Sequence, residues 1–176
     1  MRRNPLSTIF VRPSALDRRR GRLIAGSLSI RCALGRGGVV RAKREGDGGT
    51  PAGALRAVEL MFRPEIGHPD APFLPSRPIR PDQGWCDDPR HPQYNRRVAL
   101  PFPGSHERLW RDDALYNCVI ELDWNRRPAI KGRGSAIFVH IARPGFTPTE
   151  GCIAVSASAM RRLLPLLSTE TRFVIA

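Results

Sequence analysis

Glycine and proline interrupt this chain along its whole length, which restricts the secondary structure that it can form. The 176 residues include 16 glycines and 17 prolines, and they are spread along the chain rather than gathered in one tail. Both residues disfavour the interior of a helix, so long helices have little room. Short strands joined by many turns fit such spacing. The sequence therefore predicts a mainly β protein, a β-sandwich with one or two short helices.

Short apolar runs between these breakers mark the expected elements. A hairpin is expected over 22–34, with its turn at 25–27. Ser156 is placed to cap a helix whose apolar side chains repeat at helical spacing, and Ser105 to cap a second, short helix over 105–113. Further strands are expected at 8–11, 54–62, 115–122, 135–142 and 172–175. With no internal repeat and no linker, we expect residues 1–176 to form a single domain, a monomer, whose proline-rich segment 64–103 is an ordered insertion lining a site.

The charge of the chain raises two classes of partner. Its net charge is +13, carried almost wholly by arginine, and the lysines are Lys43 and Lys131 alone. The basic residues are scattered among acids rather than forming a stripe, so we expect no nucleic-acid partner; an anionic polymer such as a cell wall stays a hypothesis. No apolar run is long enough for a transmembrane segment. Arg2 and Arg3 precede an apolar patch that stops at Pro13, so we expect no secretory signal.

The cysteines suggest a reactive thiol rather than a metal site. Cys32, Cys86, Cys118 and Cys152 lack the C-x-x-C spacing of zinc ribbons and dithiol redox motifs, so no metal site is expected. We expect free thiols, most of them small packing residues. The exception is Cys152, which follows a polar loop and Gly151. Cys86 is the main rival thiol, but it lacks a preceding glycine turn.

The stretch 135–155 holds the strongest chemical signal. An apolar run ends at His140, a loop broken by proline and glycine follows, and Cys152 opens the next apolar run. A cysteine attacks carbonyls as thiolate, and an imidazole can accept its proton. Gly151 permits a tight turn in which the N–H groups of Gly151 and Cys152 would face a developing oxyanion. Core packing is the alternative for each residue alone; together they indicate cysteine acyl transfer.

Five further residues are candidates for binding substrate. Arg143 has a guanidinium that matches a carboxylate bidentately, although a solvated loop arginine is an equal interpretation. The other four would line the cleft: Trp85, Tyr94, Asn95 and His106.

Two motifs make the chain resemble the L,D-transpeptidase catalytic domain family, also called YkuD-like. His140 and the run Thr149-Glu150-Gly151-Cys152 match the family's histidine and its Ser/Thr-His-Gly-Cys motif, and residues 46–53 match its GDGxTPxG segment. The resemblance covers about residues 28–167. Glu150 replaces a histidine, and the arginine common soon after the cysteine is absent. We expect Glu150 to face away from the cleft, or to pair with an arginine such as Arg143.

The resemblance implies a β-sandwich and a reaction on peptidoglycan stem peptides. Cys152 would attack the carbonyl that precedes a terminal D-alanine, with His140 as base, and form a thioester that an amine or water resolves. No cofactor is implied, and carbapenems are expected to acylate Cys152. Hydrolysis by an L,D-carboxypeptidase and a catalytically inactive wall-binding domain are the alternatives. The family substrate implies the periplasm or cell envelope, while the chain's expected lack of a signal leaves the cytoplasm open.

Overall fold

Nine strands form one sheet in the computed structural model, which describes residues 4–176, so that Arg2 and Arg3 lie outside the described residues. Its order is β11-β12-β13-β3-β2-β1-β14-β6-β7, and β6 also pairs with β11. The strands are β1 (Thr8–Pro13), β2 (Arg20–Ala25), β3 (Leu28–Ala33), β6 (Gly53–Phe62), β7 (Ser76–Pro78), β11 (Cys118–Leu122), β12 (Ile137–Ile141), β13 (Ile153–Val155) and β14 (Arg172–Ile175). Because β6 pairs with both β14 and β11, the sheet closes around an interior.

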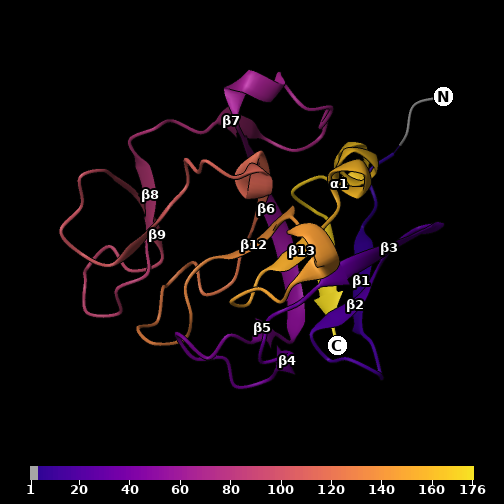
Figure 1. Ribbon diagram of the computed structural model, residues 1–176, viewed down its shortest axis with the longest axis horizontal. Helices are drawn as coiled ribbons and strands as arrows, with labels where there is room; N and C mark the ends of the chain where they lie inside the picture. The colour runs from indigo at the N-terminus through magenta and orange to yellow at the C-terminus, as the bar shows by residue number, and fades with distance from the viewer. Residues whose placement is uncertain (1–3) are drawn as a thin grey trace.

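The remaining elements are short. A three-stranded sheet has the order β10 (His106–Arg108), β8 (Gln83–Cys86), β9 (Arg96–Ala99), and Figure 1 shows β8 and β9 on the side of the molecule away from β1, β2 and β3. β4 (Val39–Val40) pairs with β5 (Thr50–Pro51). The helices are α1 (Ala157–Leu163) and the 3-10 turns η1 (Pro64–Ile66), η2 (Ala114–Tyr116), η3 (Pro144–Phe146) and η4 (Leu164–Leu166). No helix among residues 4–176 is long and apolar enough to cross a membrane.

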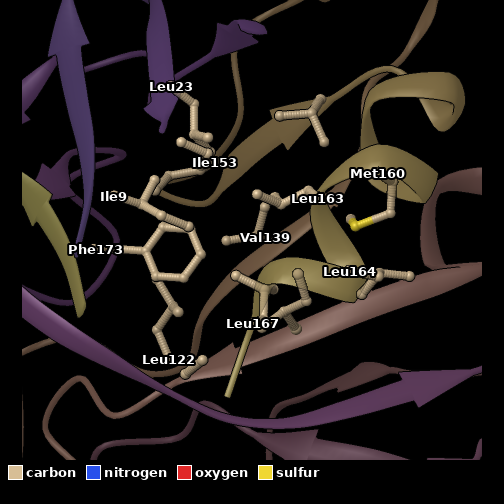
Figure 2. Packing of buried hydrophobic residues seen from close by; sticks show 14 of the residues in the cluster. Ile9, Leu23, Leu122, Val139, Ile153, Met160, Leu163, Leu164, Leu167 and Phe173 are labelled. Carbon is tan, nitrogen blue, oxygen red and sulfur yellow. The ribbon is translucent and has the colours of Figure 1, made fainter. Parts of the chain in front are cut away.

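Alternating side chains of the main sheet build the interior core. In β1, Ile9 and Val11 are fully buried while Phe10 between them is partly exposed, as expected for a strand with one buried face. Figure 2 shows side chains from several strands meeting those of α1 and its C-terminal turn. The labelled residues are Ile9, Leu23, Leu122, Val139, Ile153, Met160, Leu163, Leu164, Leu167 and Phe173.

A second apolar cluster covers part of the outer face of the sheet. Met61, Val119 and Phe138 point outward from β6, β11 and β12. Residues of the segment between β6 and β11 cover them, namely Ile79, Trp85, Leu109 and Tyr116. The ring of Trp85 meets that of Phe138 edge to face, with centroids 5.4 Å apart. The segment is therefore an ordered insertion, held to the sheet by its own buried side chains.

The mainly β class is confirmed, with a single short α-helix. The expected hairpin over 22–34 is also confirmed, since β2 and β3 pair through a turn after Ala25. α1 begins where expected, and the Ser156 hydroxyl accepts the Ala159 N–H at 3.2 Å. The helix expected over 105–113 is wrong. His106–Arg108 instead pairs with β8, because those strand contacts override the local helical preference, and Asp113 caps the later turn η2.

Candidate active site

His140 lies in β12, and Cys152 immediately precedes the adjacent parallel strand β13. In the register of β12 and β13, Val139 pairs with Ile153 and His140 with Ala154. Val139 and Ile153 point into the core, so the alternation of a strand turns His140 and the neighbouring Cys152 to the outer face. Both line one cavity of about 570 Å³. The sheet thus brings together the two residues that the sequence singled out.

A rigid turn positions Cys152. Gly151 has φ of +135°, and a Cβ there would lie 2.7 Å from the Gly49 carbonyl oxygen, so only glycine fits. The Thr149 hydroxyl donates to the Cys152 carbonyl at 2.6 Å and accepts the Gly151 N–H at 3.2 Å. The Gly151 N–H, predicted as an oxyanion donor, is therefore engaged with Thr149, and its oxyanion role stays a prediction.

The glycine-rich segment 46–53 packs against this turn through the Gly49 carbonyl. The Asp47 carboxylate accepts hydrogen bonds from Lys43 Nζ at 2.5 Å, the Arg44 N–H at 2.7 Å and the Gly49 N–H at 2.8 Å. These bonds lower the pKa of Asp47, although its partial burial opposes them. Asp47 therefore fixes the segment whose backbone touches Gly151.

His140 is held as a neutral base. Its Nδ1–H donates to the Ile141 carbonyl at 2.9 Å, and a carbonyl only accepts, so Nε2 of the neutral ring carries the free lone pair. Burial lowers the pKa of His140 to about 4, and the positive charges of Arg111 and Arg143 act in the same direction. The Tyr116 ring packs on the imidazole, with centroids 5.4 Å apart.

The thiol of Cys152 is protonated at rest. Its sulfur lies against the start of β12, where it accepts the Phe138 N–H at 3.4 Å. Burial raises the pKa of Cys152 to about 12, and the negative charge of Glu107 raises it further, against smaller opposing effects of the Phe138 N–H and Lys43. With the pKa of His140 at about 4, the resting pair is thiol and imidazole rather than thiolate and imidazolium.

Three residues between β6 and β11 that the sequence analysis did not single out also line the cavity. Glu107 from β10, Arg111 and Tyr116 all line it. The Tyr116 hydroxyl donates to Glu107 Oε1 at 2.5 Å, while Arg111 forms an ion pair with Asp113 at 2.7 Å. Glu107 is the central residue of the short strand β10, so its neighbours His106 and Arg108 point to the opposite face. A helix was expected here from the sequence, and this alternation was not considered.

The predicted substrate residues lie in three different places. Arg143 lines the cavity of Cys152, and the Tyr94 hydroxyl donates at 2.5 Å to Glu45, which lines the same cavity. Trp85 and Asn95 line a separate cavity, where the indole N–H donates to Asn95 Oδ1 at 3.0 Å.

His106 lies apart from both cavities. Its Nδ1 bonds to the Gly104 carbonyl at 2.8 Å, and its ring meets Phe102 edge to face. Among residues 4–176, the structure therefore places only Arg143 of the five beside the thiol.

Glu150 pairs with an arginine, as expected, but with a different one. Its carboxylate accepts from Arg36 Nε at 2.8 Å, and both side chains are more than half exposed. Glu150 lines the cavity, and its negative charge is balanced by Arg36, which does not line it.

The other three cysteines are buried, whereas Cys152 is partly exposed. Cys32, Cys86 and Cys118 are free and buried. Burial raises the pKa of Cys32 to about 12 and that of Cys118 to about 11, and it also raises the pKa of Cys86. Among residues 4–176, no group of three or more His, Cys, Asp and Glu side chains is placed to hold a metal ion.

Comparison with known proteins decides the family. A family model described as the L,D-transpeptidase catalytic domain, YkuD, matches residues 9–175. The chain belongs to this L,D-transpeptidase family. No curated protein matches the chain. A solved structure of L,D-transpeptidase 1 from Mycobacterium tuberculosis is similar at 12% identity and a TM-score of 0.39. The match covers 96% of this chain and 61% of that one, so the L,D-transpeptidase domain described above spans less than two thirds of that protein.

Proposed function

We propose that the protein is a cysteine acyltransferase of the L,D-transpeptidase type, acting on peptidoglycan stem peptides. The observation that carries this proposal is the placement of Cys152 and His140 on one face of adjacent strands, in one cavity. Membership of the family supports the substrate class, since the family acts on peptidoglycan. We propose a location at the cell envelope for the same reason, to be tested by fractionating cells.

The proposed reaction has two steps. His140 Nε2 accepts the thiol proton as Cys152 Sγ attacks the carbonyl that joins the L-centre of a diamino acid to a terminal D-alanine. The C–N bond breaks, the proton passes from His140 to the leaving amine, and a thioester remains on Cys152. An amine of a second stem peptide attacks the thioester, loses a proton and releases the thiol. Arg143, which lines the cavity, would bind the substrate carboxylate in this proposal.

The neutral resting pair favours one alternative, a catalytically inactive domain that binds wall peptides. With the pKa of Cys152 at about 12, thiolate is scarce at neutral pH unless the proton moves as the thiol attacks. Hydrolysis is the other alternative, because water in place of the amine gives an L,D-carboxypeptidase.

One assay separates these functions. Purified protein is incubated with a stem tetrapeptide ending in D-alanine, with and without a second peptide carrying a free amine, and the products are separated by chromatography. We expect D-alanine release together with a cross-linked dimer, both lost in Cys152→Ala and retained in Cys86→Ala. Release of D-alanine with tripeptide as the only other product would indicate hydrolysis. Binding of the peptide without any D-alanine release would contradict the enzyme and favour the inactive domain.

A further inference from the structure

Two carboxylates of the insertion line the same cavity as the thiol. In the small sheet, Glu107 pairs with Trp85, and the Asp87 N–H donates to the Ser105 carbonyl beyond the last pair. Strand alternation puts Trp85, Asp87 and Glu107 on one face, which Trp85 turns toward the main sheet by packing on Phe138. Asp87 and Glu107 both line the cavity of Cys152.

The protein leaves one of these carboxylates without a partner. Asp87 Oδ1 is buried and has no hydrogen-bond partner among residues 4–176. Buried carboxylate oxygens normally have partners, because an unsatisfied one costs free energy. Glu107 accepts a bond from the Tyr116 hydroxyl at Oε1. Burial raises the pKa of Glu107, and the negative charge of Asp87 raises it further, against the opposing effects of Tyr116 and Arg111. A cation bound between the two carboxylates would supply the missing partner and reduce their repulsion.

We propose that Glu107, with Asp87 beside it, binds a primary ammonium group of the substrate opposite Cys152 and thereby permits the thiol to ionise. This inference rests on the proposed function and assigns the protein groups that bind the free amine of the diamino acid in the acyl donor. The incoming acceptor is not the source of the cation, because it arrives after Cys152 has been acylated.

The electrostatics of the site explain why the cation matters. The charged and titratable groups near the thiol are Glu107, Lys43 and Tyr116, and those near Glu107 include Arg111, which is itself paired with Asp113. Glu107 is the negative charge that opposes thiolate. Neutralising it with an ammonium lowers the pKa of Cys152, so that His140 can accept the proton. Reactivity then depends on the arrival of the correct substrate.

Alkylation of the thiol tests the charge effect without requiring acyl transfer. The rate at which iodoacetamide modifies Cys152 is measured from pH 6 to 10, with the site of modification mapped by mass spectrometry. Glu107→Gln keeps an acceptor for the Tyr116 hydroxyl but removes the charge. We expect alkylation at pH 7.5 to rise about tenfold, since one pKa unit changes the thiolate fraction tenfold. Glu65→Gln, which removes an exposed carboxylate paired with Arg63, should leave the rate within about twofold of the wild type.

Acylation then tests the ligand. Formation of the thioester is followed with a tetrapeptide whose diamino acid carries a free amine and with the same peptide N-acetylated there. The wild type should form the thioester at least tenfold faster with the free amine. Glu107→Gln should lose this preference.

The inference is overturned if Glu107→Gln is alkylated at the wild-type rate, or if both proteins use free and acetylated peptides equally well. If no peptide forms a thioester at all, the proposed function fails. The alkylation rates then still decide whether Glu107 controls the thiol: a wild-type rate in Glu107→Gln rejects the inference, whereas a raised rate together with faster wild-type alkylation in the presence of a free-amine tripeptide, but not the acetylated tripeptide, supports it.

Discussion

At the scale of single residues, the site is built from groups held in their uncharged forms. His140 is 5% exposed and donates through Nδ1 to its own strand, while the sulfur of Cys152 lies against the backbone of β12. Burial disfavours the charged form of each group, so it lowers the pKa of His140 and raises the pKa of Cys152. In our proposal, a substrate ammonium bound by Glu107 and Asp87 lowers the pKa of Cys152 when the substrate binds.

Burial of neutral His140 predicts a specific sensitivity to acid. The pKa falls from 6.5 in the unfolded chain to about 4 in the folded one, so the unfolded state binds more protons between these values. Stability is complete above pH 6.5 and is lost as the pH falls toward 4, by about 3 kcal/mol from this residue. The free energy of unfolding, measured by urea denaturation across this range, should fall less steeply in His140→Gln than in the wild type.

A matched control separates burial from histidine content. His68 is exposed and bonds to Ser76 at 2.8 Å, so His68→Gln should keep the acid loss of the wild type. Equal pH dependence of His140→Gln and the wild type would show that His140 is not buried as a neutral base.

At the scale of elements, the insertion is attached to the main sheet by charge as well as by apolar packing. Glu59 of β6 and Glu121 of β11 are directly opposite each other and buried. Two like charges in that register are unfavourable. Arg97 of β9 reaches between them, pairing with Glu59 and approaching Glu121 at 4.0 Å, and Arg126 pairs with Glu121 at 2.7 Å. Arg77 of β7 also pairs with Glu59, at 2.7 Å, so the insertion supplies two of the cations that balance these carboxylates.

Removing the Arg97 cation should loosen the insertion. We expect Arg97→Met to lower the free energy of unfolding by about 2 kcal/mol, because it leaves two buried carboxylates facing each other with fewer counter-charges. Adding Glu59→Gln should recover part of the loss. As a control, Arg80→Gln breaks the exposed pair with Asp82 and should change stability by less than about 0.5 kcal/mol. Equal effects of Arg97→Met and Arg80→Gln, measured by urea denaturation, would contradict this role.

The elements also show which parts of the fold are readable from sequence. Strands such as β6 and β14, and the β2–β3 hairpin, follow from local alternation and turn residues, and were predicted. Cys152 and His140 were predicted because each ends or opens an apolar run. Glu107 and Tyr116 were missed, because their proximity to Cys152 depends on how the insertion folds back over β12, a contact between residues far apart in the chain. The helix expected over 105–113 failed for the same reason.

At the scale of the whole molecule, the two sheets together make the site. The closed main sheet positions the thiol of Cys152 and the imidazole of His140, and the insertion lines the same cavity with Asp87, Glu107 and Arg111. The net charge of +13 comes almost wholly from arginines along the whole chain. A positive charge of this size would attract the anionic polymer that we propose as substrate. The proposed function therefore depends on one atom, the sulfur of Cys152.

The most direct test of the account is to find where an acyl group becomes attached. The protein is incubated with a stem tetrapeptide ending in D-alanine, and its intact mass and peptide map are measured. We predict an adduct equal to the tetrapeptide acyl group without D-alanine, on the peptide that contains Cys152, absent from Cys152→Ala and retained in Cys86→Ala. An adduct that persists in Cys152→Ala, or that maps to Cys86, would contradict the account.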